Sequence, residues 1–257
     1  MESPVLTLDL GNSRLKASLF DGGDLSERFE CSTGESHLEA RLGSWIDSLP
    51  GAPSVAALSS VAHPELERTL RQSLSSISGM DLLVHPEPGL EMRVREVETV
   101  GLDRLYAARG AVELLGRSAL IVDAGTAMTV DAVESLEGGG GAFLGGAIAP
   151  GPRLQIEALG GGGARLMDVD LEPGVPALGK DTREALRAGV VVGFEGACLH
   201  LVERVSKEAG LEGACVVLTG GARSFLEPVL RAASVELVVE PALVHMGLLA
   251  AAEDARG

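Results

Sequence analysis

Two segments of the chain, one at the N-terminus and one near the middle, repeat one pattern. The first reads VLTLDLGNSRLK at residues 5–16, and the second reads LIVDAGTAMTV at residues 120–130. Each has an apolar β-type run, then Asp-x-Gly, then small hydroxyl or amide residues, then a second apolar-rich run. An internal duplication of this strand, acid, turn and strand unit predicts two similar domains that face each other across a cleft. A phosphate and its metal ion could then sit between the two acids.

The first copy carries the residue types of a phosphate cradle. Asp9 stands near the end of the strand, where it could hold Mg²⁺ through water. Gly11 lets the backbone approach a ligand closely, and Asn12 and Ser13 supply donors in a tight turn. Lys16 follows at the start of the returning strand as a point charge for a phosphate. The alternative is an ordinary hairpin, and the second copy argues against it.

In the second copy Asp123 again ends an apolar run, and Gly125 and Thr126 form the turn. The following segment, GAFLGGAIAPGPRL at residues 141–154, predicts a third strand that ends in a glycine-rich loop and opens a helix near Pro152. A helix N-terminus beside such a loop suits an anion. The segment CVVLTGG at residues 215–221 predicts another buried strand and a Gly-Gly turn, which either touches a nucleotide or serves only as a helix start.

Strand-like and helix-like segments alternate along the chain, which indicates an α/β fold. The expected division is a first domain over residues 1–116 and a second over residues 117–257. The run of glycines from Gly160 to Gly163 predicts a mobile loop. Helices are expected over residues 38–49, 64–74, 101–115, 182–205, 222–232 and 242–252, the 182–205 helix capped by the KDT at residues 180–182 and the last one packed in the core.

Composition excludes some classes of partner. Acidic residues exceed basic ones by 37 to 21, a formal net charge of −16, whereas nucleic acid binding needs clustered Lys and Arg. Cys31, Cys198 and Cys215 lack metal-ligand spacing, so we expect reduced core thiols of a cytoplasmic protein. Acids at positions 2 and 9 argue against an N-terminal signal, and no apolar run approaches the ~18 residues of a membrane span. Each of the five histidines is expected on the surface or in the core with a partner.

The segment GLDRLYAARGAVELL at residues 101–115 has apolar residues at helical spacing, with Asp103 and Arg104 in the first turn. One interpretation of Asp103 is an acid that complements the dipole at a helix start. A catalytic role is the other interpretation, and a family resemblance favours it.

The paired Asp-x-Gly hairpins resemble those of the actin, sugar-kinase and heat-shock ATPase superfamily. More closely, the chain resembles the type III pantothenate kinases, whose motifs occur here in the family's order. The matching segments are DLGNSRLK (9–16), GLDR (101–104), DAGTAMTVD (123–131), GGAIAPG (145–151), GKDT (179–182) and LTGG (218–221). The resemblance implies duplicated ribonuclease-H-like (actin-like ATPase) domains, and ATP-dependent phosphorylation of pantothenate to 4′-phosphopantothenate, the first step of coenzyme A synthesis.

The resemblance also implies roles for single residues. Asp103 would be the catalytic base that accepts the proton of the attacking hydroxyl. Asp9 would hold Mg²⁺, and Asp123 would bind a monovalent cation, K⁺ or NH₄⁺. The residues implied to contact ATP are Asp9, Gly11, Asn12, Ser13, Lys16 and Thr126, and those implied to contact pantothenate are Gly101, Leu102, Arg104 and Thr182. The family is dimeric, so a cytoplasmic homodimer with no membrane or nucleic acid partner is expected.

Two departures from the family pattern concern the substrate. The usual GADR is GLDR here, which places the bulkier Leu102 beside the expected base. The family often has a Tyr about seven residues before this motif, and counting back gives Val94. Two other functions stay open: another small-molecule kinase of the same superfamily, and a non-catalytic nucleotide-binding regulator, since relatives have been described as transcription accessory factors. The four intact residues Asp9, Lys16, Asp103 and Asp123 favour an enzyme, and a chain of 257 residues leaves no substrate-binding domain for a heat-shock-type chaperone.

Overall fold

The computed structural model describes residues 4–160 and 169–257, and divides the chain into two compact units. Unit 1 comprises the chain up to Leu90 together with Arg95–Leu114 and Ala242–Gly257, and unit 2 comprises Glu91–Val94 and Leu115–Pro241. The expected division at residue 116 differs from this in two places. The C-terminal helix belongs to unit 1, and the short segment Glu91–Val94 belongs to unit 2.

Unit 1 is built on a five-stranded sheet in the order β3-β2-β1-β4-β5. Strand β2 runs antiparallel to β1 and β3, while β1, β4 and β5 are parallel. The strands are β1 (Val5–Leu10), β2 (Arg14–Asp21), β3 (Asp24–Ser32), β4 (Val55–Ser60) and β5 (Asp81–Val84). The helices are α1 (Leu38–Asp47), α2 (Pro64–Ser75), α3 (Leu102–Leu115) and α7 (Leu243–Asp254), with a 3₁₀ turn at Val97–Thr99.

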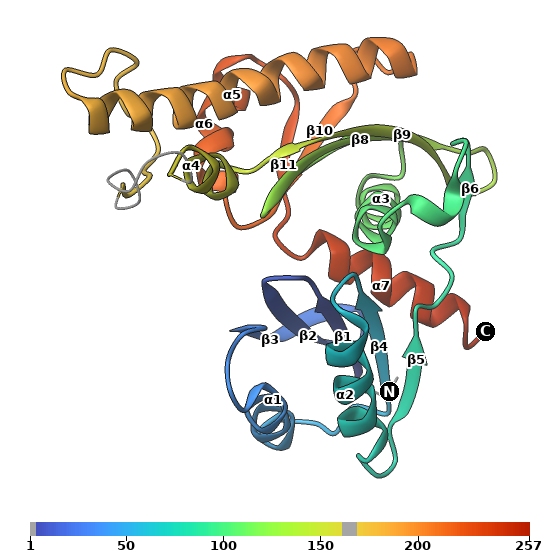
Figure 1. Cartoon of the computed structure of the whole chain (residues 1–257). Coiled ribbons are helices and arrows are strands. Elements are labelled where there is room, and N and C mark those ends of the chain that lie inside the picture. The colour runs from blue at the N-terminus through green and yellow to red at the C-terminus, as the bar shows by residue number, and fades with distance from the viewer. Residues whose placement is uncertain (1–3, 161–168) are drawn as a thin grey trace. The chain divides into compact units, whose positions relative to one another are not determined.

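Alternation along the strands of this sheet separates two differently packed faces. Leu6, Leu8 and Leu58 face the main core, which α1 and α2 complete. The opposite face packs on α7 (Figure 1). Val5 and Val55 meet Leu249 there. The last helix is therefore a packed core helix, as its apolar sequence predicted.

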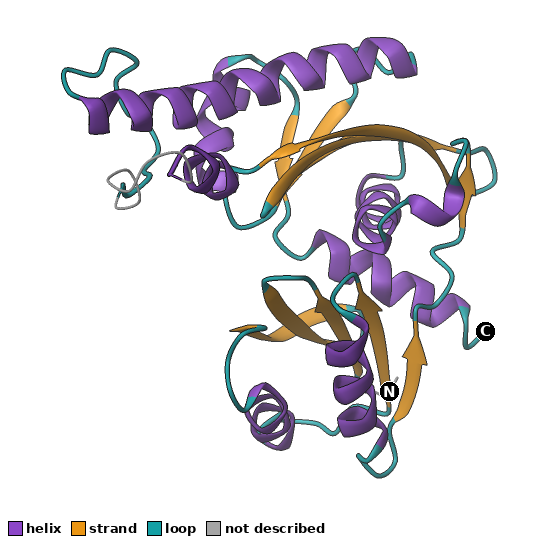
Figure 2. Cartoon of the chain, viewed as in Figure 1, coloured by secondary structure: helices purple, strands orange, loops and turns teal. Residues whose placement is uncertain are grey.

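Unit 2 repeats the same plan. Its sheet has the order β11-β10-β7-β8-β9-β6. The strands β9, β8, β7, β10 and β11 therefore take the places that β3, β2, β1, β4 and β5 have in the first sheet, and β6 is added at the edge. Figure 2 shows the helices and strands of both halves. The strands are β7 (Ala119–Ala124), β8 (Ala127–Ser135), β9 (Gly141–Pro150), β10 (Cys215–Thr219), β11 (Leu237–Val239) and β6 (Leu90–Met92). The helices are α4 (Pro152–Gly160), α5 (Thr182–Ala209) and α6 (Arg223–Ala232).

The duplication predicted from the two Asp-x-Gly segments is thus confirmed as a repeat of whole sheets, and the predicted α/β class is confirmed with it. The helices lie close to their expected bounds, but three segments were not expected from the sequence: the strand β3, the strand β6 and the 3₁₀ turn that follows β6. The expected loop at Gly160–Gly163 lies outside the described residues except for Gly160, which ends α4.

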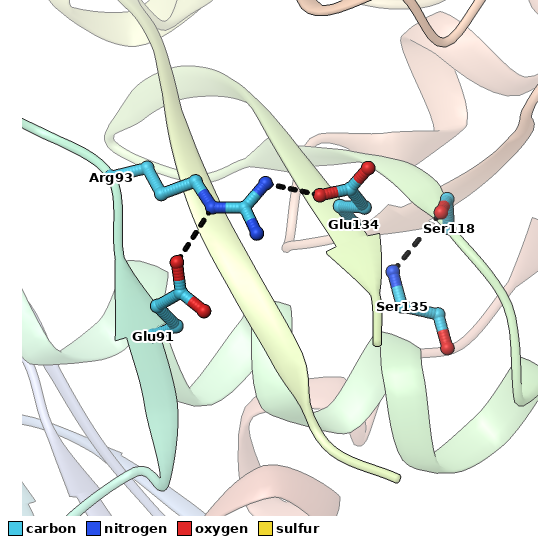
Figure 3. A network of polar contacts seen from close by, with 5 residues as sticks. All are labelled: Glu91, Arg93, Ser118, Glu134 and Ser135. Carbon is cyan, nitrogen blue, oxygen red and sulfur yellow. Dashed lines mark hydrogen bonds and ion pairs between the residues drawn. The ribbon is translucent and has the colours of Figure 1, made fainter. Parts of the chain in front are cut away.

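Side-chain contacts hold β6 and the residues after it on the edge of the second sheet (Figure 3). Arg93 donates through Nε to Glu91 at 2.8 Å and forms a second ion pair with Glu134 on β8. The backbone N–H of Arg93 donates to the carbonyl of Phe143 on β9 at 3.0 Å. At the same end of β8, the N–H of Ser135 donates to Ser118 Oγ at 3.0 Å. These contacts fix the position of Val94, one residue beyond Arg93.

The three thiols are free and buried, in agreement with the expectation of core cysteines. Burial raises the pKa of each, that of Cys198 to about 12, because a thiolate loses its hydration there. At physiological pH they are neutral apolar groups.

Candidate active site

The first acid stands in a row of polar side chains at the carboxyl end of β1. In the register of the sheet, Asp9 lies directly opposite Lys16 on β2 and Ser59 on β4. Residues that pair directly across neighbouring strands lie on the same face, with Cβ atoms about 4.5–5.5 Å apart. Carboxylate, ammonium and hydroxyl therefore share the face of the sheet that packs on α7. Asp9 and Lys16 are half-buried, whereas Ser59 is fully buried.

The turn after β1 is tight, and hydrogen bonds from Thr33 hold it in place. The N–H of Gly11 donates to the carbonyl of Arg14 at 2.9 Å, and a Cβ on Gly11 would lie 3.3 Å from that oxygen. Thr33 donates to the carbonyls of Asn12, through its hydroxyl at 2.7 Å, and of Ser13, through its N–H at 3.1 Å. The side chains of Asn12 and Ser13 are exposed, so the structure brings the residues of the expected cradle together on one open turn.

The second acid has the equivalent environment in unit 2. Asp123 pairs with Thr129 on β8 and with Thr219 on β10, so a hydroxyl again follows on the parallel neighbour. The N–H of Gly125 donates to the carbonyl of Ala127 at 2.9 Å and closes a turn that leaves Thr126 exposed. The two hairpins match, although the second turn is one residue shorter.

Two glycine loops approach the turn at Asp123. Gly220 has a φ of +90°, and a Cβ there would lie 2.4 Å from Asp123 Oδ1. A Cβ on Gly151 would lie 2.5 Å from the carbonyl oxygen of Thr126, to which the Gly151 N–H donates at 3.1 Å. The Thr-Gly-Gly and Pro-Gly segments predicted from the sequence therefore pack directly on the acid and its turn, and only glycine fits at these two positions.

The GLDR segment opens α3. The carbonyl of Gly101 accepts the N–H groups of Arg104 at 3.1 Å and Leu105 at 3.3 Å. Asp103 Oδ1 accepts the N–H of Arg104 at 2.9 Å, so the carboxylate lies over the positive end of the helix. A Cβ on Gly101 would lie 2.5 Å from the same oxygen. Glycine at position 101 is therefore what leaves room for the carboxylate of Asp103.

Thr182 is the exposed first residue of α5 in unit 2. The preceding Asp181 caps the helix, with Oδ1 accepting the N–H of Glu184 at 2.8 Å. Glu184 Oε2 accepts the N–H of Lys180 at 2.7 Å in return. This arrangement resembles a capping box, with Glu184 accepting from the residue before the N-cap, and the Asp181 bond confirms the cap predicted at KDT. Val94 lies 3.5 Å from the position that a Cβ on Gly145 would take, on the edge of the second sheet.

Helix α3 is anchored by a buried arginine. Arg109 is 9% exposed and donates to the carbonyl of Pro88 at 3.1 Å. Its guanidinium also pairs with Glu113 at 2.7 Å and with Asp254 at the end of α7 at 2.8 Å. The helix whose first turn carries Asp103 is thereby tied both to the preceding segment and to the C-terminal helix.

One buried histidine links α7 to the strand of the first acid. His245 Nδ1 lies 2.9 Å from Thr7 Oγ1, and the Thr7 hydroxyl donates to the carbonyl of Ser18 at 3.2 Å. Because the only hydroxyl proton of Thr7 is used in that bond, we assign the proton between Thr7 and His245 to Nδ1. His245 is the satisfied core histidine that the sequence allowed, and it holds β1 two residues before Asp9.

His245 predicts an acid sensitivity of the fold. Burial, helped by the charges of Lys16 and Arg28, lowers its pKa to about 3. In the unfolded chain this histidine has an ordinary pKa of ~6.5. Between the two pKa values the unfolded chain therefore binds a proton at His245 that the folded chain does not bind. The free energy of unfolding should therefore fall as pH drops from about 6.5 towards 3, by about 1.4 kcal/mol per pH unit from this group.

The check is urea unfolding of the wild type and His245→Asn at several pH values. Asn keeps a donor near the Nδ1 position and does not titrate, so its curve should be flatter by this amount through the window. Parallel pH profiles for the two proteins would show that His245 does not contribute.

The sequence analysis assigned no role to Ser59, Thr219 or His245. A pair of serines at the end of a strand is visible in the sequence, but only the register of β4 against β1 places Ser59 beside Asp9. The same holds for Thr219 and Asp123, which are far apart in the chain and adjacent in the sheet.

The donors at Asp9 suit Mg²⁺. This ion keeps several waters and uses one or two carboxylates with substrate phosphates, so a single acid with a neighbouring hydroxyl is a fitting set. The Oγ atom of Ser59 is buried and meets no hydrogen-bond partner among the residues that the structure describes, so the row contains a polar atom in need of one. Groups of three or more His, Cys, Asp or Glu with metal-ligand placement do not occur within residues 4–160 and 169–257.

Comparison with known proteins agrees with this arrangement. The family model described as type III pantothenate kinase matches residues 5–204. A type III pantothenate kinase of Streptomyces coelicolor is 35% identical, over 95% of this chain and 96% of that protein. Among solved structures, a conserved putative Baf family transcriptional activator from Campylobacter jejuni aligns with a TM-score of 0.61 at 18% identity, covering 98% of both chains.

A putative 2-dehydro-3-deoxygalactonokinase from Sinorhizobium meliloti shares the fold as well. It aligns with a TM-score of 0.60 at 15% identity, over 97% of this chain and 96% of that one. Such structural matches show the two-domain fold of actin-like ATPases and sugar kinases, and the sequence matches go further. The chain belongs to the type III pantothenate kinase family.

Proposed function

We propose that Asp9, Asp103 and Asp123 divide the work of ATP-dependent pantothenate phosphorylation, the activity of the family to which the chain belongs. The observation that carries this division is the placement of the acids. Asp9 and Asp123 end equivalent strands of the two repeated sheets, whereas Asp103 opens a helix. Two acids in strand-end hairpins suit ions and phosphates, and the third suits a proton acceptor.

Asp9 and Lys16 serve the phosphates of ATP in this proposal. Mg²⁺ held by Asp9 would neutralise charge on the phosphoryl oxygens while the phosphoryl group is transferred. The Lys16 ammonium, which shares the face of Asp9, adds a second positive charge to the same region. The open turn of Gly11, Asn12 and Ser13 supplies polar groups next to Asp9 and Lys16. In unit 2 the exposed Thr126 supplies a hydroxyl in the turn after Asp123.

Asp103 acts on the primary hydroxyl of pantothenate. Phosphoryl transfer asks the protein mainly for positioning and charge neutralisation. The carboxylate orients the hydroxyl and takes its proton as the new oxygen–phosphorus bond forms and the bond to ADP breaks. Gly101 gives the carboxylate its place, and Leu102, Arg104 and Thr182 contact the substrate.

Asp123 would hold a monovalent cation near the phosphates. A Cβ on Gly220 would lie 2.4 Å from Asp123 Oδ1 and 2.5 Å from the carbonyl oxygen of Ala124, so a carboxylate and a backbone carbonyl, both suited to a weakly hydrated cation, lie against the same glycine. We expect the rate to rise when Na⁺ is replaced by K⁺ or NH₄⁺ at constant ionic strength, and Asp123→Ala to remove this response. The check is steady-state kinetics in the three chloride salts. A wild-type rate that is indifferent to the cation would assign Asp123 to Mg²⁺ or to the fold.

For the assembly we propose a homodimer, which exposed apolar side chains of unit 2 support. Five large apolar side chains from β9, α4, α5 and the segment before α5 are exposed: Ile148, Leu154, Leu159, Leu178 and Val192. Helix α5 is long and apolar enough to pass as a membrane span by length and composition, a property shared by packed helices of soluble proteins. A second copy that packs on these side chains would remove them from water, and the free, buried cysteines support a cytoplasmic location. Light scattering should give a dimer, and Val192→Glu should shift it towards monomer.

A further inference from the structure

Ser59 has a hydroxyl whose burial the fold alone does not explain. The residue is 0% exposed, and its Oγ finds no hydrogen-bond partner among the described residues. A buried polar group left without a partner costs stability, and native structures carry few of them. Alanine would fill the same place without this cost. The hydroxyl therefore calls for a partner beyond the residues that the structure describes.

The position of Ser59 shows where such a partner would lie. Ser59 is four residues after Val55, which packs on α7, so both side chains point to that face. On this face the rows change from apolar at Val5 and Val55 to polar at Asp9 and Ser59. The unsatisfied hydroxyl thus stands beside Asp9, at the carboxyl end of the parallel strands.

Two other serines in or next to β4 do not share the placement of Ser59 beside Asp9. Ser60 points to the opposite face, and its Oγ accepts the N–H of Ala62 at 3.3 Å. Ser54, before the other end of β4, also has a buried Oγ without a partner among the described residues, but it lies far along the strand from Asp9. In unit 2 the position equivalent to Ser59 is again a hydroxyl residue, Thr219 beside Asp123.

We propose that the Ser59 hydroxyl hydrogen-bonds a water of the Mg²⁺ ion held by Asp9, and so positions the hydrated ion against the phosphates. This rests on the role proposed for Asp9. Ser59 acts through water rather than as a direct ligand. Groups in this outer position orient the inner ones, and their loss typically costs 10–100-fold in metal affinity.

The test measures metal binding and stability separately from turnover. Mn²⁺ replaces Mg²⁺ as a paramagnetic probe, and its free concentration is followed by electron paramagnetic resonance in the presence of ADP. Ser59→Ala should weaken Mn²⁺ binding roughly tenfold or more. Its metal-free urea midpoint should equal or exceed that of the wild type, because an unsatisfied hydroxyl is gone. Ser54→Ala is the matched control, with the same stability gain and unchanged Mn²⁺ binding.

Three other outcomes would contradict the proposals. Unchanged Mn²⁺ affinity in Ser59→Ala, with Asp9→Asn weakened, would overturn the inference about Ser59 and leave the role of Asp9 intact. Unchanged affinity in Asp9→Asn would overturn the proposed function of Asp9 itself. A loss of metal-free stability in Ser59→Ala would show that the hydroxyl is bonded within the fold, and would also overturn the inference.

Discussion

Replacement of Asp103 by asparagine should lower kcat by roughly 100-fold or more, the scale of a lost general base. Asn is nearly isosteric, and its side-chain oxygen can still accept the N–H of Arg104 that Asp103 Oδ1 accepts at 2.9 Å. The helix start is therefore preserved while the proton acceptor is lost. The measurement is saturation kinetics together with ATP binding by calorimetry, which should stay near the wild-type value.

Two comparisons make the expectation for Asp103 specific. Glu98→Gln removes an exposed carboxylate from the preceding 3₁₀ turn and should leave kcat within about twofold, as expected of a solvated acid. Gly101→Ala should displace the Asp103 carboxylate, because the new Cβ would lie 2.5 Å from its Oδ1, and should lower kcat without unfolding the protein. Near-normal turnover of a well-folded Asp103→Asn enzyme would contradict the assignment.

A methyl group at Gly247 should destabilise the protein by about 1–3 kcal/mol. Helices α3 and α7 touch backbone to backbone where they cross. A Cβ on Gly247 would lie 1.9 Å from the carbonyl oxygen of Tyr106, and one on Gly110 would lie 2.2 Å from that of Leu243. Gly247→Ala must therefore separate two helices that Arg109 and Asp254 also join. Since α3 carries Asp103 in its first turn, kcat should fall as well.

The matched control for Gly247 is Gly43→Ala in α1 of the same unit. Nothing lies within 4 Å of a Cβ on Gly43. Alanine there gains helix propensity and should stabilise the fold by about 0.5–1 kcal/mol. Urea unfolding of both variants should thus give changes of opposite sign. A stabilised Gly247→Ala protein would show that the two helices can part without loss.

The sequence predicted the parts of this fold that are encoded locally. The apolar runs before Asp9 and Asp123 predicted their strands, because buried parallel strands need continuous apolar residues. The periodic segments predicted the helices, and Asp181 predicted the start of α5. The shared Asp-x-Gly pattern predicted the duplication, which the repeated strand order confirms.

What escaped prediction depends on contacts between distant segments. Strand β3 has an exposed, highly charged sequence and pairs with β2 through its backbone, so its side chains carry little signal. Strand β6 is three residues long and is fixed by the sheet edge and by Arg93. Neither the pairing of Ser59 with Asp9 nor the crossing at Gly247 can be read from spacing along the chain.

A further prediction concerns Val94 and the KM for pantothenate. Val94 stands where the family often has a tyrosine, and a lost hydroxyl bond of about 0.5–1.5 kcal/mol corresponds to at most about a tenfold weaker substrate. The expected enzyme therefore has a raised KM for pantothenate and a kcat that is little changed.

Coupled release of ADP, with pantothenate and with a panel of other small hydroxy acids, tests the central claim most directly. We expect saturable, ATP-dependent release of ADP with pantothenate, and its loss in Asp103→Asn. Release with another alcohol but not with saturating pantothenate would contradict the substrate and favour a different small-molecule kinase. Nucleotide binding without turnover on any alcohol would contradict the assignment of an enzyme altogether.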